Sequence, residues 1–222
     1  ARSWLPGLVL TATPAWFLHS RTAFETMTAA TLFAGMICGY LAYRTGRPSG
    51  LGWAILASGL MFYAYNPAKA VVLAFAIAVL VVDMRFHWQN RRRIAWAPLL
   101  MLLLALPYLR FLAAHPDAVV EGLQVNRSYL TGDGTPAENL STFVRTYLRG
   151  LDPLYWSFGG EVEQIRHVMK GHGHVQWWFL LPLAWGILLS LARLRDFRYR
   201  TLLIALVAAP VARLFQTSVF FN

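Results

Sequence analysis

The chain has 222 residues, a net charge of +10 and a mean hydropathy of +0.46, and 57% of its residues are hydrophobic. A soluble domain of this size does not need so much apolar surface, and several apolar runs approach the ~20 residues with which a helix crosses a bilayer. These runs do not alternate polar and apolar side chains, as the strands of a membrane β-barrel do. We therefore expect an all-α, polytopic membrane protein.

The positive charge gathers in three short connections between the apolar runs, which is typical of cytoplasmic loops. Because the charge is divided among loops in this way, we exclude nucleic acid as a partner. The single cysteine, Cys38, lies inside an apolar run, which excludes an intrachain disulfide and a cysteine-based metal site. The basic connections contain Arg44 and Arg47; Arg85, Arg91, Arg92 and Arg93; and Arg193, Arg195, Arg198 and Arg200.

Seven apolar segments follow one another along the chain, at 4–18, 22–43, 51–65, 71–82, 94–113, 176–191 and 201–215. They predict a transmembrane helical bundle of about seven spans. Pro67 ends the third segment because proline disfavours a helical conformation of the preceding residue. Segments 51–65 and 71–82 therefore form either two short spans or one re-entrant hairpin. Small residues in the second segment favour close helix packing; they are Ala29, Ala30, Ala34, Gly35 and Gly39.

One long polar segment, 114–175, separates the transmembrane helices of 1–113 from those of 176–222. If all the basic connections lie on the cytoplasmic side, this segment is extracytoplasmic. Seven of the ten acidic residues lie in it. Within it, one helical face collects apolar side chains and predicts a short amphipathic helix on the membrane surface, ended by Asp152-Pro153. That face contains Leu140, Phe143, Val144, Tyr147, Leu148 and Leu151.

Three basic residues, Arg21, Lys69 and Arg166, flank helix ends at the predicted outer boundary. Arginine binds phosphate through paired donors and lysine supplies a point charge, so these residues are candidates for a lipid-linked phosphate. The simpler interpretation is that they reach toward the headgroups, or that Arg21 pairs with Glu25 four residues later.

Histidines close to carboxylates make a divalent metal ion the one cofactor worth considering. His167, His172 and His174 lie close to Glu161 and Glu163, and neutral imidazole binds such ions. The spacing matches no strong metal motif, so an ordinary polar loop is the simpler interpretation.

Neither the carboxylates nor the aromatic residues of the polar segment single out a catalytic group. Asp117, Asp133 and Asp152 carry no feature that marks one of them as a general base. The aromatic residues form either an interfacial belt or a platform for sugar rings; they are Tyr155, Trp156, Phe158, Trp177 and Trp178.

Several elements, taken in order, carry a resemblance to a known enzyme family. His19-Ser20-Arg21 follows a proline-bearing span, and Tyr63-Ala64-Tyr65 is followed by Lys69. The most recognisable part runs from Leu154 to Gly186; it contains Phe158-Gly159-Gly160-Glu161, Arg166-His167, Gly171, Gly173, Pro182 and Gly186. With these elements the chain resembles the polyprenyl-phosphate-dependent glycosyltransferases of the GT-C class, family 39. That group includes protein O-mannosyltransferases and aminoarabinose transferases.

The resemblance implies transfer of a sugar from a polyprenyl-phosphate carrier to a lipid, glycan or protein acceptor on the extracytoplasmic face. It makes Arg21, Lys69 and Arg166 the phosphate-binding candidates. It puts a second set of residues, Tyr63, Tyr65, Glu161 and His167, on the acceptor side of the cleft. Two positions depart from the family pattern: Lys69 stands where arginine is usual and Glu161 where aspartate is common.

Family members carry the catalytic Asp in their first extracytoplasmic loop, which is expected upstream of Ala1. The chain therefore resembles an internal fragment, and its own catalytic residues are unknown. We expect it in a bacterial plasma membrane, among membrane lipids. A transporter or flippase of a lipid-linked substrate is the alternative function, since interrupted helices such as those of 51–82 also suit transporters. A membrane subunit without chemistry is a third possibility.

Overall fold

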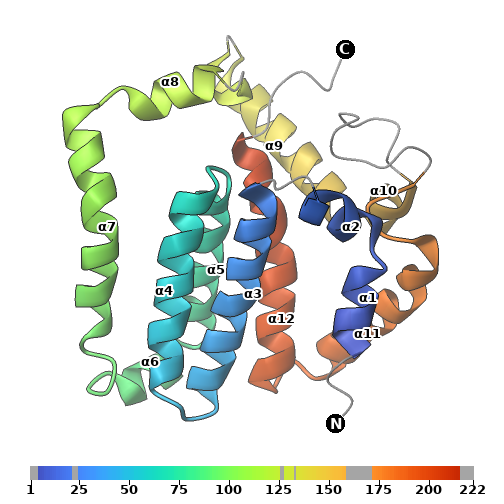
Figure 1. Ribbon diagram of the computed structural model, residues 1–222, viewed down its shortest axis with the longest axis horizontal. Coiled ribbons are helices and arrows are strands. Elements are labelled where there is room, and N and C mark those ends of the chain that lie inside the picture. The colour runs from blue at the N-terminus through green and yellow to red at the C-terminus, as the bar shows by residue number, and fades with distance from the viewer. Residues whose placement is uncertain (1–4, 22–24, 126–127, 133, 159–171, 216–222) are drawn as a thin grey trace.

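The computed structural model describes residues 5–21, 25–125, 128–132, 134–158 and 172–215 (Figure 1). These residues form helices joined by turns, and no β-strand occurs among them, which confirms the all-α class. The helices are α1 (Leu5–Thr11), α2 (Pro14–Arg21), α3 (Glu25–Arg44), α4 (Ser49–Ala64), α5 (Ala68–Val82), α6 (Met84–Asn90), α7 (Ala97–Ala114), α8 (Ala118–Val125), α9 (Pro136–Leu151), α10 (Pro153–Phe158), α11 (Leu180–Ala192) and α12 (Phe197–Ala208). Three 3-10 helices, η1 (Tyr129–Thr131), η4 (Trp177–Phe179) and η5 (Ala209–Phe215), complete the described elements.

Two of the described helices, α3 and α7, are long and apolar enough to cross a membrane. A third span is obtained if α5 and α6, which meet at an angle of 78°, are counted as one bent helix. The expectation of about seven spans is therefore wrong by helix length. The other apolar helices end too early: α4 has 16 residues, α5 has 15, α11 has 13 and α12 has 12, whereas a straight crossing needs ~20.

The turns and short helices divide between two ends of the molecule. The α3–α4 turn, α6 and the α11–α12 turn lie at one end in Figure 1, and the α4–α5 turn, α8 and α9 lie at the opposite end. All three basic connections belong to the first set. We call these the inner end and the outer end, following the positive-inside pattern. Helix α4 runs antiparallel to α3, and α5 then runs back in the same direction as α3.

Helices α3 and α4 are packed so closely that their backbones touch. A Cβ atom added to Gly39 would lie 2.7 Å from the Ala54 amide nitrogen, and one on Gly50 would lie 2.5 Å from the Tyr43 nitrogen. Gly46 turns the chain between them with φ of 92°, a left-handed conformation that glycine adopts without strain. The predicted role of small residues is thus confirmed at Gly39, whereas Ala30 and Ala34 face the exposed side.

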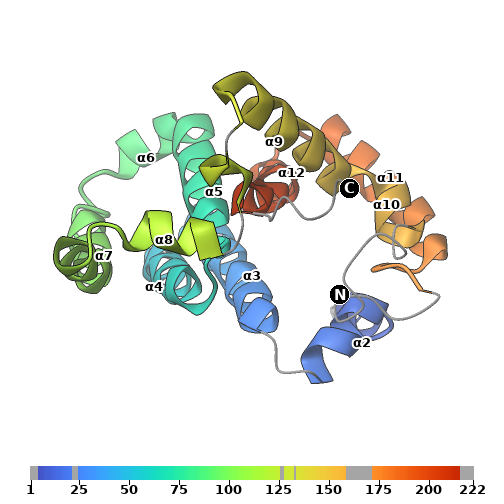
Figure 2. The same ribbon diagram turned by 90° about the horizontal axis from the view of Figure 1, so that it is seen from above.

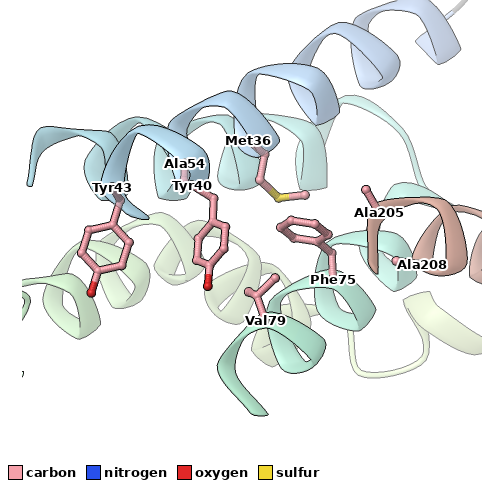
Figure 3. Packing of buried hydrophobic residues seen from close by; sticks show 8 residues of the cluster. All are labelled: Met36, Tyr40, Tyr43, Ala54, Phe75, Val79, Ala205 and Ala208. Atoms are coloured by element: carbon pink, nitrogen blue, oxygen red, sulfur yellow. The ribbon is translucent and has the colours of Figure 1, made fainter. Parts of the chain in front are cut away.

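The largest buried cluster joins α3, α4, α5 and α12. Phe75 of α5 is at its centre, and its ring makes edge contacts with Phe33 at 5.8 Å and with Tyr40 at 6.2 Å between centroids. Figure 3 shows Phe75 below Met36, and Tyr40 beside Tyr43 on the same side of α3. The buried members of the cluster are Met36, Tyr40, Tyr43, Ala54, Phe75, Val79, Ala205 and Ala208.

Helix α7 stands at the edge of the molecule and packs on α4 (Figures 1 and 2). Only Ala97 is buried along its length. An apolar helix with so little protein contact suits a lipid surrounding, in which its side chains need no further cover. The exposed apolar side chains of α7 include Leu99, Met101, Leu102, Leu103, Leu106, Leu109 and Phe111.

The predicted amphipathic helix is α9, which begins earlier than its apolar pattern. Thr135 and Glu138 form a reciprocal capping box: Glu138 N–H donates to Thr135 Oγ1, and Thr135 N–H donates to Glu138 Oε2 at 2.7 Å. The Tyr147 hydroxyl donates to the Val207 carbonyl oxygen at 2.9 Å and so attaches α9 to the outer end of α12. Three apolar residues of the same face of α9, Leu140, Val144 and Leu148, remain exposed.

Candidate functional site

Lys69 is the sequence-predicted phosphate ligand whose surroundings the structure defines best. It lies in the first turn of α5, at the outer end, just after the Asn66-Pro67 turn. Its ammonium donates to Asn66 Oδ1 at 2.9 Å and lies 4.6 Å from the centroid of the Tyr108 ring and 5.3 Å from that of Phe62. Helices α4, α5 and α7 therefore meet around one half-buried cation.

This arrangement suits recognition of an anion at the level of the headgroups. An ammonium carries three donors, and Asn66 occupies one of them. The two aromatic rings attract the cation through their electron-rich faces and hold it in place without neutralising its charge. We call Lys69, Asn66, Phe62 and Tyr108 the lysine cage.

Tyr63, predicted on the acceptor side of the cleft, uses its hydroxyl to repair α7. The hydroxyl donates to the Leu104 carbonyl oxygen at 2.7 Å and accepts from the Tyr108 amide at 3.2 Å. In a regular helix that amide would bond to that carbonyl directly. Pro107, which lacks an N–H and disturbs the helix at this turn, explains why a side chain inserts here. The hydroxyl proton of Tyr63 is therefore used within the protein, in the bond to Leu104.

The other predicted residues are spread around the outer end. Tyr65 follows the last turn of α4 and packs against the buried cluster to which Ala29, Met61 and Val71 belong. Arg21 ends α2, and its guanidinium carbon lies 4.0 Å above the ring centroid of Phe17 in the same helix. Figure 2 shows α2 and α7 on opposite sides of α3, so the contacts of Arg21 and of the lysine cage are separate. A third set, Arg166, Glu161 and His167, lies outside the described residues.

The segment that follows these residues explains one glycine of the proposed family pattern. Gly173 passes so close to α10 that an added Cβ atom would lie 2.1 Å from the Ser157 carbonyl oxygen. The neighbouring backbone is bound on two sides, since the Ala15 amide donates to the His174 carbonyl at 3.1 Å and the Val175 amide donates to the Trp156 carbonyl at 3.0 Å. This segment thus joins α2 to α10.

No metal site is assembled by the part of the chain that the structure describes, where no three potential ligand side chains from His, Cys, Asp or Glu come together. His172 and His174 are described; the other predicted ligands, His167, Glu161 and Glu163, are outside the described ranges. His174 instead places its ring 6.0 Å from that of Tyr155.

Sequence reasoning missed the most extensive polar network, which is centred on Asp83 at the inner end. The Asp83 side chain is only 2% exposed and pairs with Arg200 of α12 and with Arg44 Nε of α3, the latter at 3.2 Å. The Tyr40 hydroxyl donates to Asp83 Oδ2 at 2.6 Å. Since a buried carboxylate needs such partners, the network holds three helices together.

Aromatic side chains surround this network. The Arg44 guanidinium carbon lies 4.0 Å from the ring centroid of Phe86 and 4.8 Å from that of Phe197. The two ring nitrogens of His87 approach the hydroxyls of Tyr40 and Tyr43 at 3.3 and 3.4 Å. One signal was available in the sequence: Asp83 is an isolated acid beside a strongly basic connection.

No protein-family model matches the chain, and neither the characterised proteins nor the solved structures with which it was compared contain a match.

Proposed function

We propose that the chain is part of a membrane glycosyltransferase of the GT-C class, which moves a sugar from a polyprenyl-phosphate carrier to an acceptor on the outer face. The observation that carries the proposal is the lysine cage, which presents a fixed cation at the outer end between α4, α5 and α7. The ordered sequence elements described above support the same family. The acceptor remains a lipid, a glycan or a protein.

In this proposal Lys69 binds the phosphate of the carrier and stabilises the charge that develops as the sugar departs. The amide of Asn66 fixes the direction of the ammonium, so that little ordering is needed when the phosphate arrives. Arg21 and Arg166 remain the other phosphate candidates, and Tyr65, Glu161 and His167 the acceptor-side candidates. The Tyr63 hydroxyl stabilises α7, one wall of the lysine cage.

The proposal includes a multi-pass arrangement in a bacterial plasma membrane. Helix α4, with 16 residues, is about 24 Å long at 1.5 Å per residue, against a hydrocarbon thickness of about 30 Å. Its two ends coincide with those of α3 in Figure 1. Local thinning of the bilayer or its polar end residues accommodate such a mismatch. On this basis we include α4 among the proposed spans, beside α3 and α7.

A flippase is the second candidate because α5 and α6 form a sharply bent pair. Transporters place such breaks near the middle of the membrane, where they bind the substrate. Here the break comes at Asp83, at the inner end, and Asp83 is paired with two arginines. The bend is therefore weak support for a flippase, and the lysine cage is stronger support for the transferase.

Binding of polyprenyl phosphate to the reconstituted chain tests the proposal directly. We expect Lys69→Ala to weaken binding by about tenfold or more, because a hydrogen bond to a charged group contributes about 1.5–3 kcal/mol. Lys69→Arg should retain most of the affinity. Arg110→Ala is the control, since Arg110 is an exposed cation of α7 outside the lysine cage. Equal affinities of the Lys69→Ala variant and the unmodified chain would remove the phosphate role.

A second measurement separates the two candidate functions. Proteoliposomes containing a labelled polyprenyl-phosphate sugar are followed for movement of the label between leaflets. The transferase proposal expects no such movement beyond that of protein-free vesicles. Movement that depends on Lys69 would instead support the flippase.

A further inference from the structure

Helix α6 presents a mixed apolar and basic surface at the inner end. Phe86 and His87 point toward α3, where they contact Tyr43. On the opposite side Met84 is 61% and Trp88 68% exposed, unusually high values for such large apolar side chains. Arg85 and the turn Arg91–Arg93 lie next to them, and all four of these arginines are exposed. We call Met84, Arg85, Trp88 and Arg91–Arg93 the elbow surface.

The Asp83 network fixes the direction of this surface. Asp83 lies between α5 and α6, and its carboxylate is held by Arg44 and Arg200 from two other helices. The backbone stays bonded through the break, since the Asp83 amide donates to the Val79 carbonyl and the His87 amide donates to the Asp83 carbonyl. As a result α6 departs from α5 at 78° and lies across the end of the bundle.

The positive charge of the elbow surface is not neutralised within the described part of the chain. The nearest carboxylate in the sequence, Asp83, is already paired with Arg44 and Arg200. Arg91 stacks its guanidinium carbon 5.0 Å from the Trp88 ring centroid, which brings a cation and an apolar ring to the same spot. The surface therefore calls for a partner that is both anionic and apolar.

We propose that the elbow surface binds anionic phospholipids of the inner leaflet. Met84 and Trp88 enter the boundary between headgroups and acyl chains, where tryptophan is favoured. Arg85 and Arg91–Arg93 bind the lipid phosphates through paired N–H donors. A bilayer is favoured over an acidic protein because the surface continues directly from α5, an apolar helix with many exposed side chains. This inference requires the membrane orientation but not sugar transfer.

Fluorescence quenching in nanodiscs tests the proposal on the complete chain. Phospholipids with brominated acyl chains quench a tryptophan that touches them, and the contribution of Trp88 is the difference between the unmodified chain and Trp88→Phe. We expect brominated phosphatidylglycerol to quench Trp88 more than brominated phosphatidylcholine at equal mole fraction. The excess should fall as the salt concentration rises.

Variants assign the preference to the arginines. Each basic residue near an anionic surface contributes up to about fivefold, so the triple change of Arg91, Arg92 and Arg93 to Gln should reduce the preference by up to about a hundredfold. The same triple change to Lys keeps the charge and should retain it. Arg110→Gln, at the outer end, should leave it unchanged.

Three results would overturn the proposal. The first is equal quenching of Trp88 by the two lipids, and the second is a loss of preference in Arg110→Gln as large as in the triple Gln variant. The third is protection of Trp88 by an added acidic protein or oligonucleotide in place of the lipid. None of these results bears on binding of polyprenyl phosphate to Lys69, so this inference and the proposed function fail separately.

Discussion

The hydroxyl of Tyr63 in α4 lies inside the hydrogen-bond ladder of α7, 2.7 Å from the carbonyl oxygen of Leu104. It replaces a bond that α7 lacks in the turn next to Pro107. In a lipid surrounding, an unpaired backbone group is costly because no water can satisfy it. The side chain of one helix thus completes the backbone of another.

Removal of this hydroxyl should destabilise the chain, and the size of the effect should depend on Pro107. We expect Tyr63→Phe to lower the free energy of unfolding by about 1–3 kcal/mol, the cost of leaving a backbone group without its partner where lipid excludes water. In Pro107→Ala the ladder of α7 can close directly, so the same change should cost less. Unfolding in mixed micelles measures both effects as a double-mutant cycle. Equal costs in the two backgrounds would contradict the proposed repair.

Loss of the Asp83 carboxylate should be the more damaging change. Asp83→Asn leaves Arg44 and Arg200 buried or half-buried without their anion, and we expect a loss of about 3–5 kcal/mol in the same measurement. Asp196→Asn is the matched control, because Asp196 caps α12 by accepting from the Arg198 amide. Asn caps helices as well as Asp does. Similar losses in the two variants would argue against the network.

Gly173 should resist substitution where a second glycine tolerates it. Gly173→Ala places a methyl group against the Ser157 backbone, so the 172–175 segment must move away from α10. We expect faster hydrogen exchange at two amides, that of Ala15, which donates to this segment, and that of Val175, which donates from it to α10. Gly186→Ala, with nothing within 4 Å of the added atom, should leave the exchange unchanged. Unaltered exchange in Gly173→Ala would show that the close approach is not maintained.

The capping box of α9 should weaken in acid. The Thr135 amide and hydroxyl donate to the Glu138 carboxylate and hold its pKa below the usual value. A lowered folded-state pKa means that the stabilisation is present above the pKa of the unfolded state and is lost as the pH falls through the folded-state pKa. Protection of the Thr135 amide against hydrogen exchange, taken relative to the intrinsic exchange rate at each pH, should therefore fall in that acidic range. Glu138→Gln keeps the acceptor but does not titrate, so its cap should show no such dependence.

The helical class, the order of the apolar segments and the amphipathic pattern of α9 could be predicted from the sequence because each depends on neighbouring residues. The number of full-length spans could not, since it depends on where helices stop. Helix α4 stops shortly before Pro67 after 16 residues, and α5 stops at Asp83 after 15 residues. Local composition does not reveal how far such short helices reach into a bilayer.

Of the lysine cage, only Lys69 could be predicted from the sequence. Lys69 was singled out by its place at the end of a span, but its cage uses Phe62 and Tyr108, which belong to other helices. The use of Tyr63 by α7 and the pairing of Asp83 with Arg200 are likewise contacts between distant parts of the chain. A single sequence contains no direct signal for such pairs.

The distance between Asp83 and Arg200 along the chain also has a consequence for biogenesis. The two residues are 117 positions apart, which at normal translation rates separates their synthesis by on the order of ten seconds. During that interval the nascent chain contains α3 with Arg44 but no α12. In a prematurely terminated product Asp83 would pair with Arg44 but would lack Arg200. In such a product the direction of α6 would be fixed by an ion pair to one helix, α3, instead of two.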